Sequence, residues 1–276
     1  MQKLAGVVIL YNPPEDVFDN IMTYYPYLDF LYILDNSEKI NNQLIAKIRE
    51  LHKAQYICHH DNLGISYSLN EALRLSQNKF NWLLTMDQDS SFKENTFSNY
   101  IQCIDLLSNN VYGLTSLIFL PPKGETIKGT LQNVESCITS GNIINIDIAI
   151  KAGGFDERLF IDEVDNEFCY RCNKMGFKLI RYNKSIMNHK VGTPLYGSIL
   201  GRKFITENHS YVRAYYIFRN CLYVSSRYPQ KRLFYYNILI RRFIKLLLAG
   251  TGKKKKCLYI LKGILDYKRG VVGKLK

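Results

Sequence analysis

Short, mostly apolar runs recur along the first 120 residues of the chain, and most of them end in polar residues. Many of the side chains in these runs are β-branched or aromatic, as at positions 7–9 and 30–34. A continuous run of this composition is typical of a strand that is buried on both faces. The pattern predicts strands at residues 6–11, 30–34, 56–58, 82–86 and 113–120.

Apolar residues between these runs recur at the spacing of a helix. Leu44, Ile48 and Leu51, for example, would lie on one face of a helix. Strands that alternate with helices form parallel βαβ units, so we expect an α/β fold with a doubly wound, mostly parallel, Rossmann-like sheet. Helices are predicted at residues 15–25, 41–53, 66–76, 96–107 and 146–152.

Polar side chains follow three of the predicted strands. Asn12 and Asp35 follow the first two strands, and Asp87 and Asp89 follow the run at 82–86. Ligands of open α/β sheets bind at the carboxyl ends of the strands. Two acidic side chains there suit Mg²⁺ or Mn²⁺, which would bridge to phosphates of a substrate. A solvated turn is the competing interpretation, because Asp and Ser are turn formers.

Two common classes of nucleotide enzyme are disfavoured by missing motifs. No Gly-x-Gly-x-x-Gly follows the first predicted strand, and no Walker loop occurs in the chain. Because these loops hold the phosphates of dinucleotides and nucleoside triphosphates, a dinucleotide dehydrogenase and a P-loop enzyme are both disfavoured.

Carboxylates crowd the segment at residues 156–168. Five of them lie from Asp156 to Asp165, and Glu167 follows. Like charges close together raise one another's pKa, which is one way to tune a general base. An acidic helix N-terminus, which the helix dipole favours, is the alternative, and both interpretations can hold together.

The cysteines indicate a reducing compartment. There are seven of them, without a regular framework, and the apolar run at residues 4–10 is too short for a secretory signal. We therefore expect reduced thiols in a cytosolic protein. Cys169-x-x-Cys172 resembles half of a zinc site, but no second pair lies at a suitable spacing, which favours two half-buried helix cysteines.

The positive charge of the chain is concentrated at its end. Residues 241–276 contain 12 Lys or Arg and one acid, Asp266, and so carry +11 of the total net charge of +13. Helices are predicted at 211–227, 237–248 and 257–265. Basic amphipathic helices lie in the interface of anionic membranes, although a solvated basic face on an ordinary helical core is the alternative. No run approaches the roughly 18 apolar residues of a membrane span, and no nucleic-acid-binding module is recognised.

A set of short motifs occurs in order along residues 4–220. It comprises Val8-x-x-Tyr11-Asn12-Pro13, Leu34-Asp35-Asn36-Ser37, Asn62-Leu63-Gly64-Ile65, Asn70-Glu71-Ala72, Leu84-Thr85-Met86-Asp87-Gln88-Asp89-Ser90, Ser140-Gly141, Gly153-Gly154-Phe155-Asp156-Glu157-x-Leu159-Phe160-Ile161-Asp162-x-Val164-Asp165-x-Glu167-x-Cys169-x-Arg171 and His209-x-x-x-Arg213-x-Tyr215-Tyr216-x-x-Arg219-Asn220. Each motif is weak alone, but the ordered set is specific. Together the motifs resemble the family 2 inverting glycosyltransferases, most closely the bacterial rhamnosyltransferases of polysaccharide biosynthesis.

This resemblance implies a GT-A fold, a nucleotide-sugar donor and a divalent metal. Asp89 would be the main ligand of Mn²⁺ or Mg²⁺, with Asp87 as its partner in the Asp-x-Asp pair. Asp165 aligns with the catalytic base of the family. Many members carry Glu-Asp where this chain has Val164-Asp165, so Asp162, Glu163 and Glu167 remain alternatives for the base. The donor-binding residues that the resemblance implies are Tyr11, Asn12, Asp35, Asn62, Gly64, Asp87, Gln88 and Asp89, with Asp35 against the nucleotide base.

Two histidines are further candidates. His189 and His209 would be able to contact a diphosphate or a metal ion, and His189 is a candidate metal ligand. The competing interpretation is that each is a packed or surface side chain, which is the more frequent role of a single histidine.

The sequence therefore predicts a metal-dependent, inverting glycosyltransferase that is peripheral at the cytoplasmic face of the cell membrane. It would add a sugar, with L-rhamnose from dTDP-rhamnose as the leading donor, to a growing, lipid-linked cell-surface polysaccharide. The alternatives are a UDP-dependent galactosyl- or glucosyl-transferase, and a nucleotide-sugar-binding or basic-tail interaction protein without turnover.

The same interpretation of the sequence predicts the organisation of the chain into domains. We expect a catalytic domain at residues 1–205, with a nucleotide-binding half at 1–120 and an acceptor half at 121–205. A helical, basic region would follow at 206–276, with membrane contact through 238–276. The tyrosine-rich helix near Tyr215 either forms a homodimer interface or packs internally.

Overall fold

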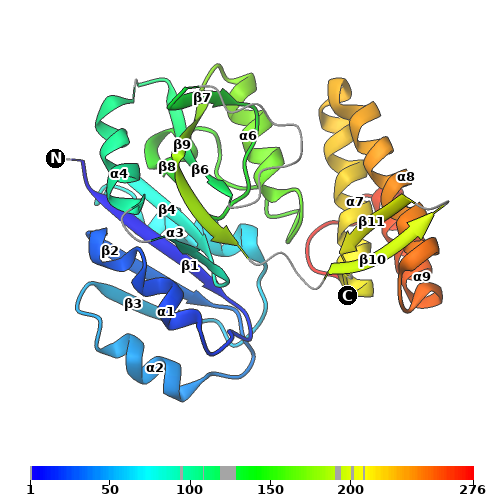
Figure 1. The fold of residues 1–276 in the computed structure, drawn as a ribbon, viewed down its shortest axis with the longest axis horizontal. Helices are drawn as coiled ribbons and strands as arrows, with labels where there is room; N and C mark the ends of the chain where they lie inside the picture. Colours follow the sequence, from blue (N-terminus) through cyan, green and yellow to red (C-terminus); the bar gives the residue numbers. More distant parts are fainter. Residues whose placement is uncertain are drawn as a thin grey trace. The chain divides into compact units, whose positions relative to one another are not determined.

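The computed structural model describes residues 2–93, 96–107, 109–118, 129–189, 194–199, 202–207 and 209–276. The chain divides into two compact units (Figure 1). The sheet unit comprises Met1–Glu157 and Val164–Lys190, and the helical unit comprises Arg158–Glu163 and Val191–Lys276. The domain boundary expected at residue 205 stays a prediction.

The described part of the sheet unit contains one nine-stranded, twisted sheet. Its strand order is β3-β2-β1-β4-β8-β6-β9-β5, and β7 pairs with β9 (Figure 1). The strands are β1 (Leu4–Leu10), β2 (Phe30–Asp35), β3 (Ala54–Cys58), β4 (Trp82–Asp87), β5 (Ser90–Phe92), β6 (Val111–Ile118), β7 (Leu131–Val134), β8 (Asn142–Asn145) and β9 (Lys178–His189).

Strands β1 to β4 are parallel, as predicted. β1 lies between β2 and β4, and its register places Leu10 beside Asp35 and Ile9 beside Asp87. The carboxyl ends of three adjacent strands therefore meet at one edge of the sheet, where the polar side chains of the motifs follow.

The other half of the sheet is mixed. β8 runs antiparallel to both β4 and β6, and β9 runs parallel to β6 but antiparallel to β5 and β7. The apolar pattern of the sequence does not predict β5, β7, β8 or β9. Three of them have only three or four residues, and polar side chains such as Ser90 and Asn142 interrupt the apolar pattern that identifies a strand.

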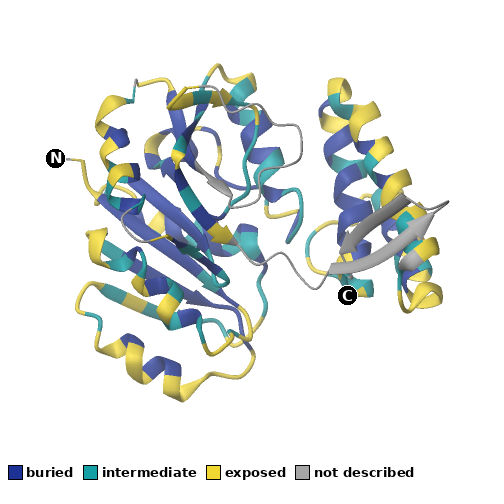
Figure 2. Cartoon of the chain, in the orientation of Figure 1, coloured by how far each residue is buried: buried dark blue, intermediate teal, exposed yellow. Residues whose placement is uncertain are grey.

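Helices cover both faces of the sheet. Residues of α1, α2 and α4 share a core cluster with Val8, Leu10 and Met86, whereas α3 lies on the other face, where the Tyr32 hydroxyl donates to the Leu75 carbonyl. Buried residues follow the strands and the sides of these helices (Figure 2). The helices are α1 (Val17–Met22), α2 (Asn42–Arg49), α3 (Ile65–Ser76), α4 (Thr96–Gln102), α5 (Ile146–Lys151) and α6 (Val164–Lys174), with 3₁₀ turns at Tyr25–Tyr27 and Cys103–Leu106.

The described part of the helical unit contains three long helices and a hairpin. α7 packs against α9 so closely that a Cβ on Gly263 would lie 2.6 Å from the Tyr215 carbonyl oxygen. Tyr215 and Tyr216 are buried inside this unit, so these two rings pack internally. The elements are β10 (Pro194–Ile199), β11 (Arg202–Glu207), α7 (Tyr211–Arg227), the 3₁₀ turn Pro229–Lys231, α8 (Arg232–Ala249) and α9 (Lys253–Lys268).

Among the described residues, every helix is too short or too polar to span a membrane.

Candidate functional site

Asp35 ends β2 and is almost completely buried, at 1 % exposure. The Tyr56 hydroxyl donates to Asp35 Oδ2 over 2.7 Å, and the Ser37 amide donates to Asp35 Oδ1 over 2.8 Å. Burial and the hydrogen bond to Asp35 both raise the pKa of Tyr56, so the phenol stays protonated and continues to donate. Asp35 is thus held rigidly at the edge where a nucleotide base is expected.

Gln88 ties the end of β1 to the turn after β4. Its side chain accepts from the Tyr11 amide over 2.9 Å and donates to the Tyr11 carbonyl over 3.1 Å. The Asn12 amide donates to Ser37 Oγ over 2.7 Å, which joins the same segment to β2. Gln88 therefore positions the backbone of Tyr11, while the Tyr11 ring is 43 % exposed and available for stacking.

Asp87 and Asp89 flank Gln88 in the turn from β4 to β5, and both are half-buried. The Asp87 amide donates to Ser140 Oγ over 3.0 Å, which fixes the turn against the segment before β8. Tyr24 lies behind this turn: its burial, and secondarily the Asp87 carboxylate, raises the pKa of its hydroxyl.

The donor set at this turn fits a hard divalent cation. Mg²⁺ and Mn²⁺ prefer carboxylate oxygens, and Mg²⁺ is commonly held by one or two carboxylates together with water and substrate phosphates. Within the described residues, no group of three or more His, Cys, Asp or Glu side chains is placed to hold a metal. Asp87 and Asp89 would therefore form a two-carboxylate site that a phosphate ligand completes. The backbone of His189 pairs with Ser90 in the sheet, but its side chain lies outside the described part of the structure.

The predicted donor-binding segment Asn62–Gly64 directly precedes α3, with Gly64 as the N-cap of the helix. The Gly64 amide donates to Asn62 Oδ1 over 3.1 Å, and Gly64 has a φ of +87°, which suits glycine. Next to it lies a residue that sequence reasoning missed. His59 bridges Asn36 Oδ1, at 3.0 Å from Nδ1, and Glu71 Oε2, at 2.7 Å from Nε2. This network holds the segments after β2 and β3 together at the candidate donor site.

Asp165 lies in the first turn of α6 and is half-buried. Its Oδ1 accepts from the Asn166 amide over 2.8 Å. The positive end of the helix dipole stabilises a carboxylate at this position. An ionised carboxylate that remains partly exposed can accept a proton from a substrate, which is what the role of a base requires.

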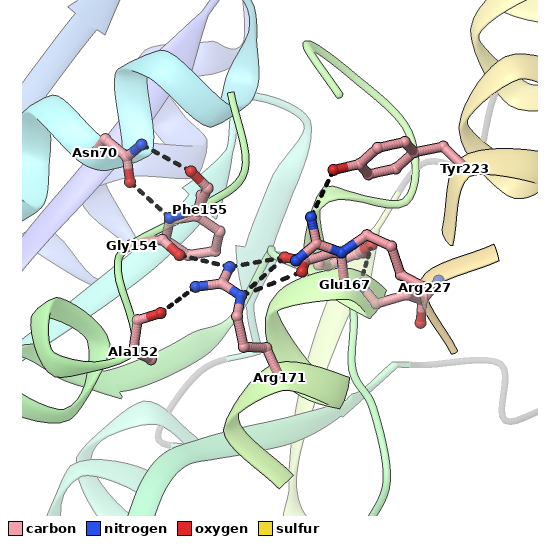
Figure 3. A network of polar contacts seen from close by, with 10 residues as sticks. Asn70, Ala152, Gly154, Phe155, Glu167, Arg171, Tyr223 and Arg227 are labelled. Atoms are coloured by element: carbon pink, nitrogen blue, oxygen red, sulfur yellow. Dashed lines mark hydrogen bonds and ion pairs between the residues drawn. The ribbon is translucent and has the colours of Figure 1, made fainter. Parts of the chain in front are cut away.

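Glu167, two residues later, is fully buried and forms an ion pair with Arg171 (Figure 3). Arg171 Nη2 lies 2.7 Å from Glu167 Oε2, and the same guanidinium donates to the carbonyls of Ala152 and Gly154. A Cβ on Gly154 would lie 2.5 Å from Asn70 Oδ1, so only glycine fits here. The ion pair thus fixes the turn before the acidic segment and favours Asp165 over Glu167 as the base.

Asp162 and Glu163 belong to the helical unit and also have partners there. Arg213 Nε lies 3.2 Å from Asp162 Oδ1, and the Tyr235 hydroxyl donates to Glu163 Oε2 over 2.6 Å. Burial raises the pKa of Asp162, although the positive charges of Arg213 and His209 oppose the shift. His209 therefore lies near a carboxylate.

The loop at Arg158–Glu163 has a strained backbone. Phe160, Asp162 and Glu163 all adopt left-handed φ values between 61° and 64°. The Asn220 side chain on α7 donates to the carbonyls of Leu159 and Ile161, at 2.8 Å and 2.6 Å, and holds this conformation. Strain of this kind is frequent at functional sites and persists only where the surrounding structure enforces it.

The structure brings several of the candidates together within the sheet unit and assigns others to the helical unit. The register of β1 places Asp35 and Asp87 at one edge, and Gln88 joins that edge to Tyr11. Asp165 and Glu167 belong to the same unit as this edge, whereas Asp162 and Glu163 belong to the helical unit.

Comparisons with known proteins agree with this architecture. Residues 15–143 match the model of glycosyl transferase family 2. The chain is 26% identical over 298 residues to the dTDP-rhamnosyl transferase RfbF of Shigella flexneri, with 98% of this chain and 97% of that protein covered.

A solved structure shares the fold. The crystal structure of GalNAc-T7 with UDP, GalNAc and Mn²⁺ aligns with a TM-score of 0.61 at 13% identity. The alignment covers 82% of this chain and 48% of that chain, so this chain spans about half its length. The mixed, twisted sheet with its helices is thus a GT-A fold, followed by a helical C-terminal region. Residues 15–143 thus match glycosyl transferase family 2, and the chain is similar to a dTDP-rhamnosyl transferase along nearly its whole length.

Proposed function

We propose that the chain transfers L-rhamnose from dTDP-rhamnose to a growing, lipid-linked cell-surface polysaccharide at the cytoplasmic face of the membrane. The choice of dTDP-rhamnose as donor is supported by the similarity to a dTDP-rhamnosyl transferase over nearly the full length of both proteins. A UDP-dependent galactosyl- or glucosyl-transferase is the second candidate, because the structural neighbour was solved with UDP.

Asp165 is the proposed base. We expect its carboxylate to accept the proton of an acceptor hydroxyl as the hydroxyl oxygen attacks the anomeric carbon. The bond from that carbon to the diphosphate breaks in the same displacement, which inverts the anomeric configuration. The exposed part of Asp165 at the start of α6 supports this role, since a fully buried acid such as Glu167 has no route to a substrate.

The carboxyl ends of β1, β2 and β4 form the proposed donor site. Asp35 and Tyr11 would contact the base of the nucleotide, and Asp87 and Asp89 would hold Mn²⁺ or Mg²⁺. The metal would supply positive charge that stabilises the departing diphosphate. Gln88 and Ser140 keep the two carboxylates in place through their backbone contacts.

Donor binding tests this proposal. We expect calorimetric titration in Mn²⁺ to detect dTDP-rhamnose but not UDP-glucose, UDP-galactose or GDP-mannose, and EDTA to abolish the signal. Asp89→Asn should lose the metal-dependent part of the affinity, whereas Asp105→Asn, at an exposed acid on the Cys103–Leu106 turn, should not. A preference for a UDP-sugar would favour the UDP-dependent galactosyl- or glucosyl-transferase instead. Binding of none of the four nucleotide sugars would refute the proposed donor site.

The helical unit carries the proposed membrane contact. α8 exposes an apolar stripe in which Leu233 is 73 % exposed and Ile240 is 57 % exposed. The other exposed apolar residues of α8 are Phe234, Tyr236, Phe243, Ile244, Leu247 and Leu248. Arg241, Arg242 and the lysines at the start of α9 lie beside this surface in the sequence, and each basic residue near an anionic membrane contributes about 1 kcal/mol. An interfacial helix matches this combination better than a solvated one, because its apolar side chains would leave water.

Vesicle binding tests the membrane contact. We expect phosphatidylglycerol-containing vesicles to retain the chain at low salt and Leu233→Asn with Ile240→Asn to weaken binding at least about tenfold, since each buried apolar side chain is worth about 1.5–3 kcal/mol. Leu106→Asn is the matched control, because Leu106 is 74 % exposed but lies in the sheet unit. Equal retention of both variants, or retention by duplex DNA instead of vesicles, would contradict the proposal.

A further inference from the structure

Two thiols face each other in the sheet unit. The Sγ atoms of Cys137 and Cys169 are 4.0 Å apart, and both cysteines are free. Cys169 is buried on α6, one helical turn after Asp165, while Cys137 is half-buried in the segment between β7 and β8. A disulfide has an S–S bond of about 2.05 Å, so a sulfur displacement of about 2 Å would join them.

The environment of this pair favours reaction at the Cys169 sulfur. The Cys137 and Cys169 sulfurs are within hydrogen-bond distance, and this contact lowers the pKa of Cys169 and raises that of Cys137. The thiolate is the reactive form of cysteine. Burial raises the pKa of three other thiols, those of Cys103, Cys221 and Cys172, the last to about 12, which disfavours their thiolate form.

The Cys137 segment connects α6 to the candidate metal turn. Asn173 Nδ2 on α6 donates to the Glu135 carbonyl over 2.7 Å, one turn beyond the contact between the two cysteines. Three residues after Cys137, Ser140 Oγ accepts from the Asp87 amide over 3.0 Å. A displacement of this segment would therefore act on the helix that carries Asp165 and on the turn that carries Asp87.

We propose that Cys137 and Cys169 form a peroxide-sensitive modification site that closes to a disulfide and slows the enzyme. One hydroperoxide oxidises the pair: both S–H bonds and the O–O bond break, one S–S bond forms, and with hydrogen peroxide two waters leave. A sulfenic acid on one sulfur is the intermediate, and attack by the second sulfur releases the second water. A thiol reductant reverses the reaction by exchange. The effect on turnover rests on the proposed function, whereas the formation of the bond does not.

Mass spectrometry of the full chain tests the formation of the bond. After treatment with hydrogen peroxide in slight excess and digestion without reductant, we expect a cross-linked peptide that joins Cys137 to Cys169 and is two hydrogens lighter than its separate parts. Cys103, Cys172 and Cys221 should remain reduced. A disulfide between other cysteines, or oxidation confined to Cys58 and Cys257, would overturn the proposal.

Turnover of the same samples tests the effect of the bond. We expect oxidation to lower dTDP release from dTDP-rhamnose by about tenfold to a hundredfold, because displacing reacting groups by about 1 Å has effects of this size. Dithiothreitol should restore the rate. Cys137→Ser should make the enzyme insensitive to peroxide, while Cys257→Ser, at a half-buried thiol on α9, should leave the sensitivity intact. A cross-linked enzyme with an unchanged rate would contradict the regulatory role, and an enzyme that is inactive before oxidation would refute the proposed function instead.

Discussion

Replacing Asp165 with asparagine should lower kcat for sugar transfer by about 10²–10⁴-fold while the donor affinity changes by less than about twofold. The magnitude is that of removing a general base, because the amide cannot take the proton of the attacking hydroxyl. The donor affinity should survive because the Asp-x-Asp turn and Asp35 are held by other contacts, those of Ser140 and Tyr56. Steady-state kinetics with calorimetric donor binding on the same preparation measures both quantities.

The matched control is Asp147→Asn. Asp147 is also an acid in the first turn of a helix of the sheet unit, but it is exposed on α5 and no part of the candidate site. Its variant should keep its rate, which separates the loss of a base from the loss of a favourable charge at a helix N-terminus. If Asp165→Asn keeps most of its kcat, the base lies elsewhere, and Asp162 and Glu163 become the next residues to replace.

Replacing Arg171 with alanine should lower the free energy of unfolding by about 3–5 kcal/mol. The change removes the ion-pair partner of Glu167, which is fully buried, and breaking a buried pair from one side costs about this much. It also removes the donor to the carbonyls of Ala152 and Gly154. Urea unfolding followed by the fluorescence of Trp82, the single tryptophan, which lies in β4, measures the loss.

Two further variants show whether the ion pair causes the loss. Arg49→Ala removes an exposed arginine from the last turn of α2 and should change the free energy of unfolding by less than about 0.5 kcal/mol. The double variant Glu167→Gln, Arg171→Met should be more stable than Arg171→Ala, because a neutral glutamine carries no buried charge that needs a cation. A loss below about 1 kcal/mol for Arg171→Ala would show that Glu167 has no structural role and restore it as a candidate base.

The parallel half of the sheet could be predicted because its strands are mostly apolar, with few polar interruptions such as Gln55 and Thr85. The antiparallel half could not, since strands such as β8, with Asn142 and Asn145 at its ends, lack that pattern. β9 mixes Lys, Arg and Asn with apolar residues over 12 positions, and its register against β6 shifts twice. Pairing with neighbours that are distant in sequence, and not local propensity, makes these segments strands.

The candidate site shows the same division. Asp35, Asp87 and Asp89 were recognisable because acids follow apolar runs directly, and parallel topology brings strand ends together. The contact between Gln88 and Tyr11 joins residues that are 77 positions apart, so no local pattern reveals it. The ion pair of Glu167 with Arg171, in contrast, is indicated by a local pattern, because the two residues have the i,i+4 spacing of a helical ion pair.

The sharpest test of the proposed activity is dTDP release from dTDP-rhamnose by the unmodified chain, first in Mn²⁺ and then in EDTA. Transfer of the sugar to water needs no identified acceptor, so the assay requires only the chain, the donor and the metal. We predict slow, metal-dependent release that Asp165→Asn abolishes and Asp147→Asn leaves unchanged. Release that persists in EDTA or in Asp165→Asn would contradict the assignment of the metal turn or of the base. No release at any donor concentration would contradict the claim that this chain turns over dTDP-rhamnose.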